Sequence, residues 1–270
     1  MEPSSQSSSS AIPIAIVAGF GLIALAIFFS GIGKSTTTAP VAAVQQKVAV
    51  ADAQKAKSNI RPIDETDYIR GNPNAPIVIV EYSDYDCPFC KSFHETMNQI
   101  MNEYGVGGKV AWVYRQFPIE QLHPSAPRIS KAALCVGELG GNEAFWEFSD
   151  KVFAGRGINE QTNISRLSEY ATSVGIDSGS YNTCMESSRH DESITKSLAD
   201  GANAGIQGTP NSFVIVGNQQ APIEGAQPYP IVKQIVQNLI NQLEGGEATA
   251  PPTDPLENPE ATDGMGATHN

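Results

Sequence analysis

At 270 residues, the chain is long enough for one large domain or two small ones. Its formal net charge of −12 argues against nucleic-acid binding, because a nucleic-acid-binding protein needs a basic face to displace counterions from phosphates. The sequence also has no phosphate-binding glycine loop and no evident serine–histidine–acid arrangement. We therefore expect no nucleic-acid partner.

The N-terminal part of the chain has the composition of a membrane anchor. After a serine-rich polar stretch at residues 1–10, residues 11–30 carry no charge and are dominated by Ile, Ala, Phe, Leu, Val and Gly. This length crosses a hydrocarbon core of about 30 Å as a helix. A cleaved signal peptide has a basic start and a shorter apolar run, whereas Glu2 is the only charged residue before this one. We predict a retained transmembrane helix at residues 11–30, with cleavage after the helix as the alternative.

Two further segments lack a globular pattern. Residues 31–65 begin with Gly, Ser and Thr and continue with Ala, Gln and Lys, as expected of a linker or stalk. Residues 246–270 have too few large apolar side chains to offset the entropy of ordering, so a disordered acidic tail is predicted. Lysines after the apolar run would place the next domain in the cytoplasm, but long domains cross membranes largely regardless of flanking charge.

Residues 66–245 have the pattern of a folded domain. Residues 77–81 read as a buried β-branched strand, a helix follows from Cys87 to about Tyr104, and residues 110–114 read as a second strand. Together they predict a βαβ unit. The helix is expected to bury one stripe of apolar side chains: Phe93, Met97, Ile100 and Tyr104.

The rest of the domain is helical at first and then returns to strands. Four amphipathic helical runs are predicted, at residues 124–139, 142–153, 164–174 and 177–203. A strand follows at residues 212–216, and a turn leads to a short strand ending near Glu224. The last helix ends at Gly245 and presents one apolar face: Ile231, Ile235, Leu239 and Leu243.

The segment Cys87-Pro88-Phe89-Cys90 lies at the junction of the first strand and its helix. A helix N-terminus stabilises negative charge, so a thiolate on Cys87 would be favoured there. Pro88 suits the first helical position, where its missing N–H costs nothing. A thiolate is both the better nucleophile and the better leaving group in disulfide exchange. The segment therefore predicts a redox-active dithiol.

Two other roles for these cysteines are less favoured. A zinc site would add His94, but structural zinc normally takes four ligands in two paired clusters, and the chain has no second cluster. We therefore expect no metal and no cofactor, and His94 is predicted to be an exposed helix residue. A purely structural Cys87–Cys90 disulfide would constrain the unfolded chain very little, because its loop has four residues.

These features resemble a known family. The βαβ and ββα order, the Cys-x-x-Cys and the Thr209-Pro210 before the third strand resemble the thioredoxin fold, and the helical block resembles that of the DsbA-like disulfide oxidoreductases. The resemblance implies an α/β thioredoxin fold with a helical insert at about 119–205, preceded by one transmembrane helix. It covers residues 66–245 and is carried by four segments: Glu81–Cys90, Tyr114–Pro118 with His123-Pro124, Lys131–Cys135 and Ala144–Phe148.

The resemblance also implies roles for single residues. Cys87 would be the exposed, attacked sulfur and Cys90 its buried partner. Pro210 would be the cis-proline beside them, although the Thr209-Pro210 dipeptide alone would suggest an ordinary turn. A substrate peptide could pair with the backbone of Thr209, next to Pro88, Phe89 and Pro210.

Glu81 and Phe89 both bear on the redox chemistry of the dithiol. Glu81 matches a buried acid that the family uses for proton transfer near the inner cysteine; the alternative is a strand-end acid that faces solvent. At the position of Phe89, oxidising members often carry a histidine that helps to hold the thiolate. Because Phe89 has no charge, a less strongly oxidising couple is expected.

Cys135 and Cys184 form the remaining pair. If Cys87 and Cys90 pair locally, only one of the three possible connectivities is left for them. Closing a loop of about 50 residues would stabilise the fold by roughly 4 kcal/mol. The alternative is two free buried cysteines that act as small hydrophobic residues. A persistent structural disulfide implies an oxidising compartment, which favours an extracytoplasmic domain.

The sequence thus predicts an enzyme, a DsbA-like protein thiol:disulfide oxidoreductase. We expect a single-pass cell-membrane protein whose domain, on the periplasmic or cell-surface side, forms disulfides in unfolded or reduced exported proteins. The resemblance implies reoxidation by a quinone-linked membrane thiol oxidase of the DsbB or vitamin-K-epoxide-reductase type. A reductase or isomerase that uses the same dithiol, and a non-catalytic peptide-binding module, are the alternatives.

Overall fold

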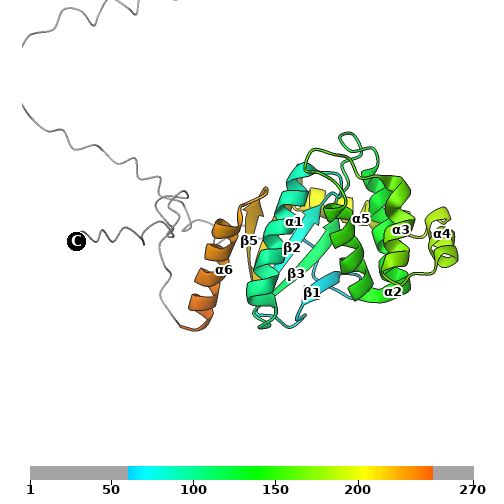
Figure 1. Ribbon diagram of the computed structural model, residues 1–270. Coiled ribbons are helices and arrows are strands. Elements are labelled where there is room, and N and C mark those ends of the chain that lie inside the picture. The colour runs from blue at the N-terminus through cyan, green and yellow to red at the C-terminus, as the bar shows by residue number, and fades with distance from the viewer. Residues whose placement is uncertain (1–59, 246–270) are drawn as a thin grey trace, which may run out of the picture. The chain divides into compact units, whose positions relative to one another are not determined.

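The computed structural model describes residues 60–245, which contain a five-stranded sheet in the order β1-β3-β2-β4-β5 (Figure 1). The central strands β2 (Ile77–Ser83) and β3 (Val110–Gln116) are parallel, as a βαβ unit requires. The other strands are antiparallel to their neighbours: β1 (Tyr68–Gly71), β4 (Asn211–Val216) and β5 (Gln219–Glu224).

The two parallel strands are buried on both faces, which explains their nearly continuous apolar sequences. Side chains alternate between the faces, so Ile79 and its register partner Trp112 enter one hydrophobic core while Val80 and its partner Val113 enter another. The first core holds α1, α6 and the insert helices α2, α3 and α4, whereas Leu198 of α5 packs against the second core. The second core includes Ile60, from the segment before β1.

Helix α1 (Pro88–Ile100) follows β2 and passes through a π-helical turn (Met101–Gly105) before β3. Phe93, Met97 and Ile100 are fully buried as predicted, whereas Tyr104 is only partly buried against the core. The C-terminal helix α6 (Tyr229–Leu243) contacts α1.

The predicted apolar face of α6 lies one residue from the centre of its buried face, with Ile235 and Leu239 partly buried against the core. The buried side chains are Val232, Val236 and Ile240, while Leu243 is 48% exposed. Both this series and the predicted one repeat every four residues, so periodicity alone favours neither. The packing of α6 against α1 and the sheet decides between them.

The insert begins with the long helix α2 (Ala126–Ala154). After α2, the insert contains the short 3-10 helix η3 (Ile164–Arg166) and the helices α3 (Leu167–Ser173), α4 (Ser178–Glu186) and α5 (Asp191–Asn203). Helix α2 contacts β1 and α5 contacts β3. Figure 1 shows α2, α3 and α4 in green to yellow-green beside the sheet. The predicted runs 124–139 and 142–153 join at a kink in α2, and the predicted run 177–203 is two helices.

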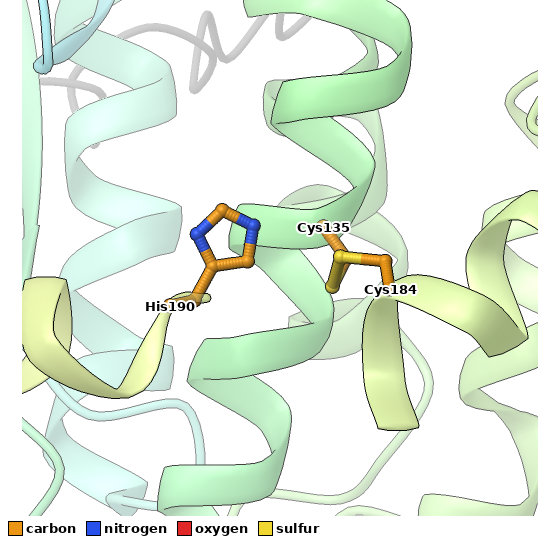
Figure 2. Close-up of side chains that lie close together, drawn as sticks. All are labelled: Cys135, Cys184 and His190. Carbon is orange, nitrogen blue, oxygen red and sulfur yellow. A yellow bond between two sulfur atoms is a disulfide. The ribbon is translucent and has the colours of Figure 1, made fainter. Parts of the chain in front are cut away.

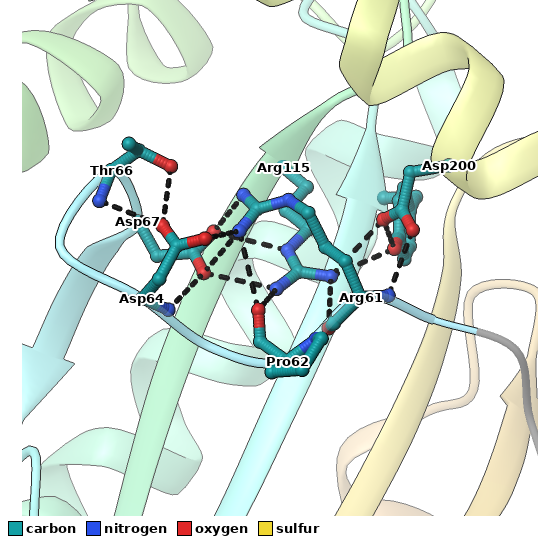
Figure 3. Close-up of polar contacts among 8 residues, drawn as sticks. Arg61, Pro62, Asp64, Thr66, Asp67, Arg115 and Asp200 are labelled. Atoms are coloured by element: carbon teal, nitrogen blue, oxygen red, sulfur yellow. Dashed lines mark hydrogen bonds and ion pairs between the residues drawn. The ribbon is translucent and has the colours of Figure 1, made fainter.

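The segment before β1 is packed, although residues 31–65 were predicted to be a linker. Ile60 is buried, and Arg61 and Asp67 join a network around the buried Arg115 (Figure 3). Arg115 donates to both oxygens of Asp67 at 2.9 and 3.0 Å and to Asp200 at 3.2 Å, and Arg61 donates to Asp67 at 2.6 Å. The folded part therefore extends to at least Ile60.

Several predictions lie outside the described residues. These are the polar N-terminus at 1–10, the transmembrane helix at 11–30, most of the linker and the tail at 246–270. Among residues 60–245, none of the helices combines the length and the apolar character needed to cross a membrane.

Candidate active site

The start of α1 places the two cysteines of the predicted dithiol. Cys87 is the N-cap residue, with extended backbone angles, and Pro88 occupies the first helical position. Cys90 lies in the first turn and is fully buried, and both cysteines are free thiols. Cys87 is only 4% exposed, so the expected exposed sulfur is largely covered by its neighbours.

The two thiols differ strongly in acidity. A hydrogen bond from the Cys90 thiol, followed by bonds from the Cys90 backbone, Thr209 and the Phe89 backbone, lowers the pKa of Cys87 to about 6 against the effect of burial. Burial, and then the bond to Cys87, raises the pKa of Cys90 well above its ordinary value. At neutral pH, Cys87 is therefore the thiolate and Cys90 the thiol.

The loop before β4 forms the other side of the site. The Thr209–Pro210 peptide bond is cis, and Cys87 Sγ lies 3.4 Å from the Thr209 carbonyl oxygen, to which it donates when it is protonated. Pro210 is buried, whereas Phe89 is 65% exposed beside the partly exposed Pro88. The Thr209 carbonyl group and the exposed Phe89 side chain thus both lie near Cys87.

Glu81 lies inside the domain on β2 and is fully buried, so the alternative of a solvent-facing acid is wrong. Its Oε2 accepts a hydrogen bond of 2.9 Å from Trp112 Nε1. Burial raises the pKa of Glu81 to about 7, and its charge in turn raises the pKa of Cys90. A carboxyl group that titrates near neutral pH is suited to proton exchange.

The prediction that His94 is exposed is wrong. Its side chain is 3% exposed, its Nε2 lies 2.7 Å from Asp150 Oδ1, and its ring packs against Trp112 and Phe153. The reason is its position one turn after Cys90, on the side of α1 that faces α2. Its bond to Asp150 joins the two helices.

The second pair of cysteines is a disulfide between α2 and α4. Cys135 and Cys184 are bonded, with a Cα–Cα distance of 5.8 Å, and His190 lies beside them (Figure 2). Within residues 60–245, these three side chains are the one group spaced as metal ligands would be. Because the two sulfur atoms are bonded to each other, they offer no thiolate to a metal in this state.

The sequence matches the thioredoxin family model over residues 64–236. The chain belongs to the thioredoxin family. Solved structures with a similar fold include the thiol-disulfide exchange protein alpha-DsbA2 from Wolbachia pipientis, at 25% identity and a TM-score of 0.54 over 65% of this chain and 88% of that one. BdbD from Bacillus subtilis is 21% identical, with a TM-score of 0.57 over 66% of this chain and 94% of that one.

These neighbours confirm the predicted likeness of this thioredoxin-family chain to DsbA-type thiol:disulfide oxidoreductases. Curated relatives include the Na(+)/H(+) antiporters NhaA 1 of Mycobacterium sp. strain KMS and of Mycolicibacterium gilvum. Each is 30% identical over 193 residues, which is 69% of this chain. The chain spans only 28% of the length of these relatives.

Asp84 and Arg156 are further residues of this thioredoxin-family site that were not singled out from the sequence. The backbone N–H of Asp84 donates to Cys90 Sγ at 3.4 Å, and the buried Asp84 carboxylate contacts His123 Nδ1 at 2.8 Å. Arg156 donates to the carbonyl oxygens of Tyr85 and Cys87. The two carboxylates Asp84 and Asp86 stand next to the Cys-x-x-Cys and could have been suspected, but no local pattern marks Arg156.

Proposed function

We propose that the chain is a membrane-tethered, extracytoplasmic thiol oxidase that forms disulfides in exported proteins through Cys87 and Cys90. The observation that carries this proposal is the unequal acidity of the two thiols: the pKa of Cys87 is about 6, whereas that of Cys90 lies well above its ordinary value. A stabilised Cys87 thiolate favours the reduced dithiol, so the oxidised form tends to pass its disulfide on.

The reaction has two exchange steps. A substrate thiolate attacks Sγ of Cys87 in the Cys87–Cys90 disulfide, which forms a mixed disulfide and releases Cys90 as a thiolate. The second thiolate of the substrate then attacks the substrate sulfur of the mixed disulfide and releases the Cys87 thiolate. The substrate loses two electrons and two protons, and the Cys87–Cys90 disulfide becomes a dithiol.

Proton transfer in the first step is assigned to Glu81. Cys90 is fully buried and is released as an anion, which the low-dielectric interior disfavours. With a pKa of about 7, Glu81 is partly protonated at neutral pH and can supply the proton that Cys90 takes up.

The surroundings of Cys87 support an extended polypeptide as the substrate. The Thr209 carbonyl lies 3.4 Å from Cys87 Sγ, at the start of β4, where a peptide backbone can pair in the manner of a strand. Phe89, 65% exposed, can contact apolar side chains that an unfolded protein has not yet buried. We therefore propose unfolded or reduced exported proteins as partners, bound along Pro88, Phe89, Thr209 and Pro210.

The location of the domain rests on two supports. A disulfide between Cys135 and Cys184 suits an oxidising compartment. The uncharged apolar run at residues 11–30 suits a membrane anchor. Reoxidation would then come from a quinone-linked membrane thiol oxidase of the DsbB or vitamin-K-epoxide-reductase type, which accepts the two electrons.

The redox equilibrium of Cys87–Cys90 against a glutathione buffer, measured on the full chain, tests the direction of the reaction. A potential of about −120 to −180 mV supports an oxidase, whereas a value near about −270 mV indicates a reductase. In parallel, the oxidised chain is mixed with a reduced, unfolded protein. Disulfide transfer that is lost in Cys87→Ala supports the enzyme; peptide binding without transfer in the unaltered chain supports a binding module.

A further inference from the structure

A buried arginine contacts the active-site turn from the helical insert. Arg156 follows the last residues of α2 and is only 6% exposed. Its guanidinium donates to Tyr85 O at 2.9 and 3.2 Å and to Cys87 O at 2.8 Å. Its remaining bonds go to carbonyl oxygens of its own loop, those of Gly157, Ile158 and Glu160.

All of these acceptors are uncharged. Among residues 60–245, no carboxylate lies within ion-pair distance of Arg156, although most of the buried cations of a protein have such a partner. Burial accordingly lowers the pKa of Arg156, and four nearby acidic groups oppose this shift: Asp86, Cys90, Cys87 and Asp84. At neutral pH, the Cys87 thiolate is therefore one of the anions that stabilise this cation, beside the carboxylates of Asp86 and Asp84.

The position of the cation is unusual for a helix. Arg156 lies at the N-terminus of α1, where the helix dipole is already positive, and a second positive charge there is unfavourable unless an anion is present. Asp86 and the Cys87 thiolate both provide negative charge at this helix end. Phe89 has no charge with which to stabilise the Cys87 thiolate. The Arg156 guanidinium, which lies outside the Cys-x-x-Cys segment, can supply a positive charge for this purpose.

We propose that Arg156 is a positioning residue for disulfide exchange, one that holds the backbone of the Cys87 turn and supplies the buried positive charge that favours the Cys87 thiolate. A second bond between the same two segments, from Thr162 N to Asp86 Oδ1 at 2.8 Å, keeps the loop after α2 against the turn. The insert thereby acts on the redox centre through Arg156.

Other ionisable groups surround the same turn. They are Glu81 on β2, Asp84 with His123 bound to it, Asp86 and Cys90, together with Lys91 on α1, whose Nζ donates to Phe153 O and pairs with Glu95. All of these residues are retained in an Arg156 variant, so the difference between variant and unaltered chain reports the loss of the guanidinium together with its effect on these groups.

The test measures the alkylation of Cys87 by iodoacetamide as a function of pH, on the reduced full chain, with the modified residue identified by mass spectrometry. Arg156→Gln removes the charge, and we expect the midpoint of Cys87 alkylation to rise by more than about half a pH unit. By linkage, a rise from about 6 to about 7 reduces the stabilisation of the dithiol at pH 7 about fivefold, which the glutathione equilibrium reports. Arg156→Lys keeps the charge, and its midpoint should stay within about half a unit of the original.

Arg70→Gln is the matched control, because Arg70 is also largely buried and joins β1 to α2 through Asp150 without touching the Cys87 turn. It should reduce stability and leave the midpoint unchanged. An unchanged midpoint in a folded Arg156→Gln chain overturns the proposal. If that variant does not fold, Arg156→Lys decides: a rise of a full unit despite the retained charge overturns it as well.

This inference rests on the proposed function, because it concerns the sulfur that the substrate attacks. The two can fail separately. Alkylation reports the Cys87 thiolate without any substrate, whereas the oxidase proposal fails on the measured potential and on disulfide transfer.

Discussion

Burial changes the acidity of two side chains near the dithiol in ways that also govern stability. Glu81 and His94 are both almost fully buried, and burial favours the uncharged form of each. For the acid this means a raised pKa, and for the base a lowered one. The two residues therefore give the folding free energy opposite slopes with pH.

We predict that Glu81→Gln removes a loss of stability at high pH. The pKa of Glu81 is raised from 4.5 to about 7, so its contribution is fully present below pH 4.5 and is lost as pH rises through 7. At about 1.4 kcal/mol per pKa unit, the loss is on the order of 3 kcal/mol. Urea unfolding of the oxidised chain at pH 5 and pH 8 measures it. Glu224→Gln, at an exposed position, serves as the control. The prediction is contradicted if the free energy of unfolding changes equally between pH 5 and pH 8 in the unaltered chain and in both variants.

His94→Phe is predicted to act on the acid side. The folded pKa of His94 is lowered, so the unfolded chain takes up its proton first, and stability that is present above pH 6.5 is lost as pH falls. Phenylalanine fits between Trp112 and Phe153 and has no proton to gain. The free energy of unfolding, measured between pH 7 and pH 5, should therefore fall less steeply in the variant as the pH is lowered. Glu81→Gln should keep the original acid slope here, and a variant as acid-sensitive as the unaltered chain would refute the assignment.

At the scale of elements, α2 depends on a single glycine. Gly141 interrupts the helix with φ 78° and ψ −171°, a conformation that is essentially restricted to glycine. A Cβ built on it meets no atom within 4 Å, so a substitution there is opposed by the backbone and not by crowding. The kink allows the two halves of α2 to follow different directions in the insert.

Gly141→Ala is therefore expected to lower the free energy of unfolding by about 1–3 kcal/mol. Gly208→Ala is the matched control, because its Cβ also meets nothing within 4 Å and its φ is not positive. It should change stability far less. Chemical denaturation of both variants compares them, and equal stabilities would show that α2 accommodates alanine by straightening.

The elements with long apolar patterns were predictable from the sequence. Strands β2 and β3 and helix α1 form as the periodicity indicates, and the family resemblance supplied the topology that periodicity does not contain. Strand β1 was missed, because Tyr68–Gly71 is short and only partly buried, and its pairing with β3 is a tertiary contact. The buried face of α6 was misplaced by one residue for a related reason, because it is decided by the tertiary contact between α6 and α1.

The redox cysteines were evident because their chemistry lies within four consecutive residues. Arg156 was not, since its bond to Cys87 joins residues 69 apart and depends on how α2 ends. His94 was misjudged because a histidine in a helix gives no sign of which face it occupies, and here Asp150, also distant in the sequence, fixes it. Short-range patterns thus predict the reacting atoms, while the groups that set their acidity come from tertiary packing.

At the scale of the whole molecule, the Cys135–Cys184 disulfide joins α2 to α4 across 49 residues of the insert. A loop of this length stabilises by about 4 kcal/mol, chiefly because the link restricts the unfolded chain. The total stability of a domain is about 5–15 kcal/mol, so this single bond is a large part of it. A chain that cannot oxidise these cysteines should therefore fold only marginally.

The double variant Cys135→Ala/Cys184→Ala separates this stabilisation from the redox chemistry. It should lower the free energy of unfolding by about 4 kcal/mol in urea, while the Cys87–Cys90 equilibrium of the remaining folded chain stays unchanged, because neither residue contacts the active-site turn. The Cys135→Ala single variant is the control, since it breaks the same bond and should lose about as much. If the double variant is as stable as the oxidised chain, the disulfide is not a stabilising element. If instead the Cys87–Cys90 equilibrium shifts, the bond acts on the redox centre through α2, whose C-terminal end leads directly into Arg156.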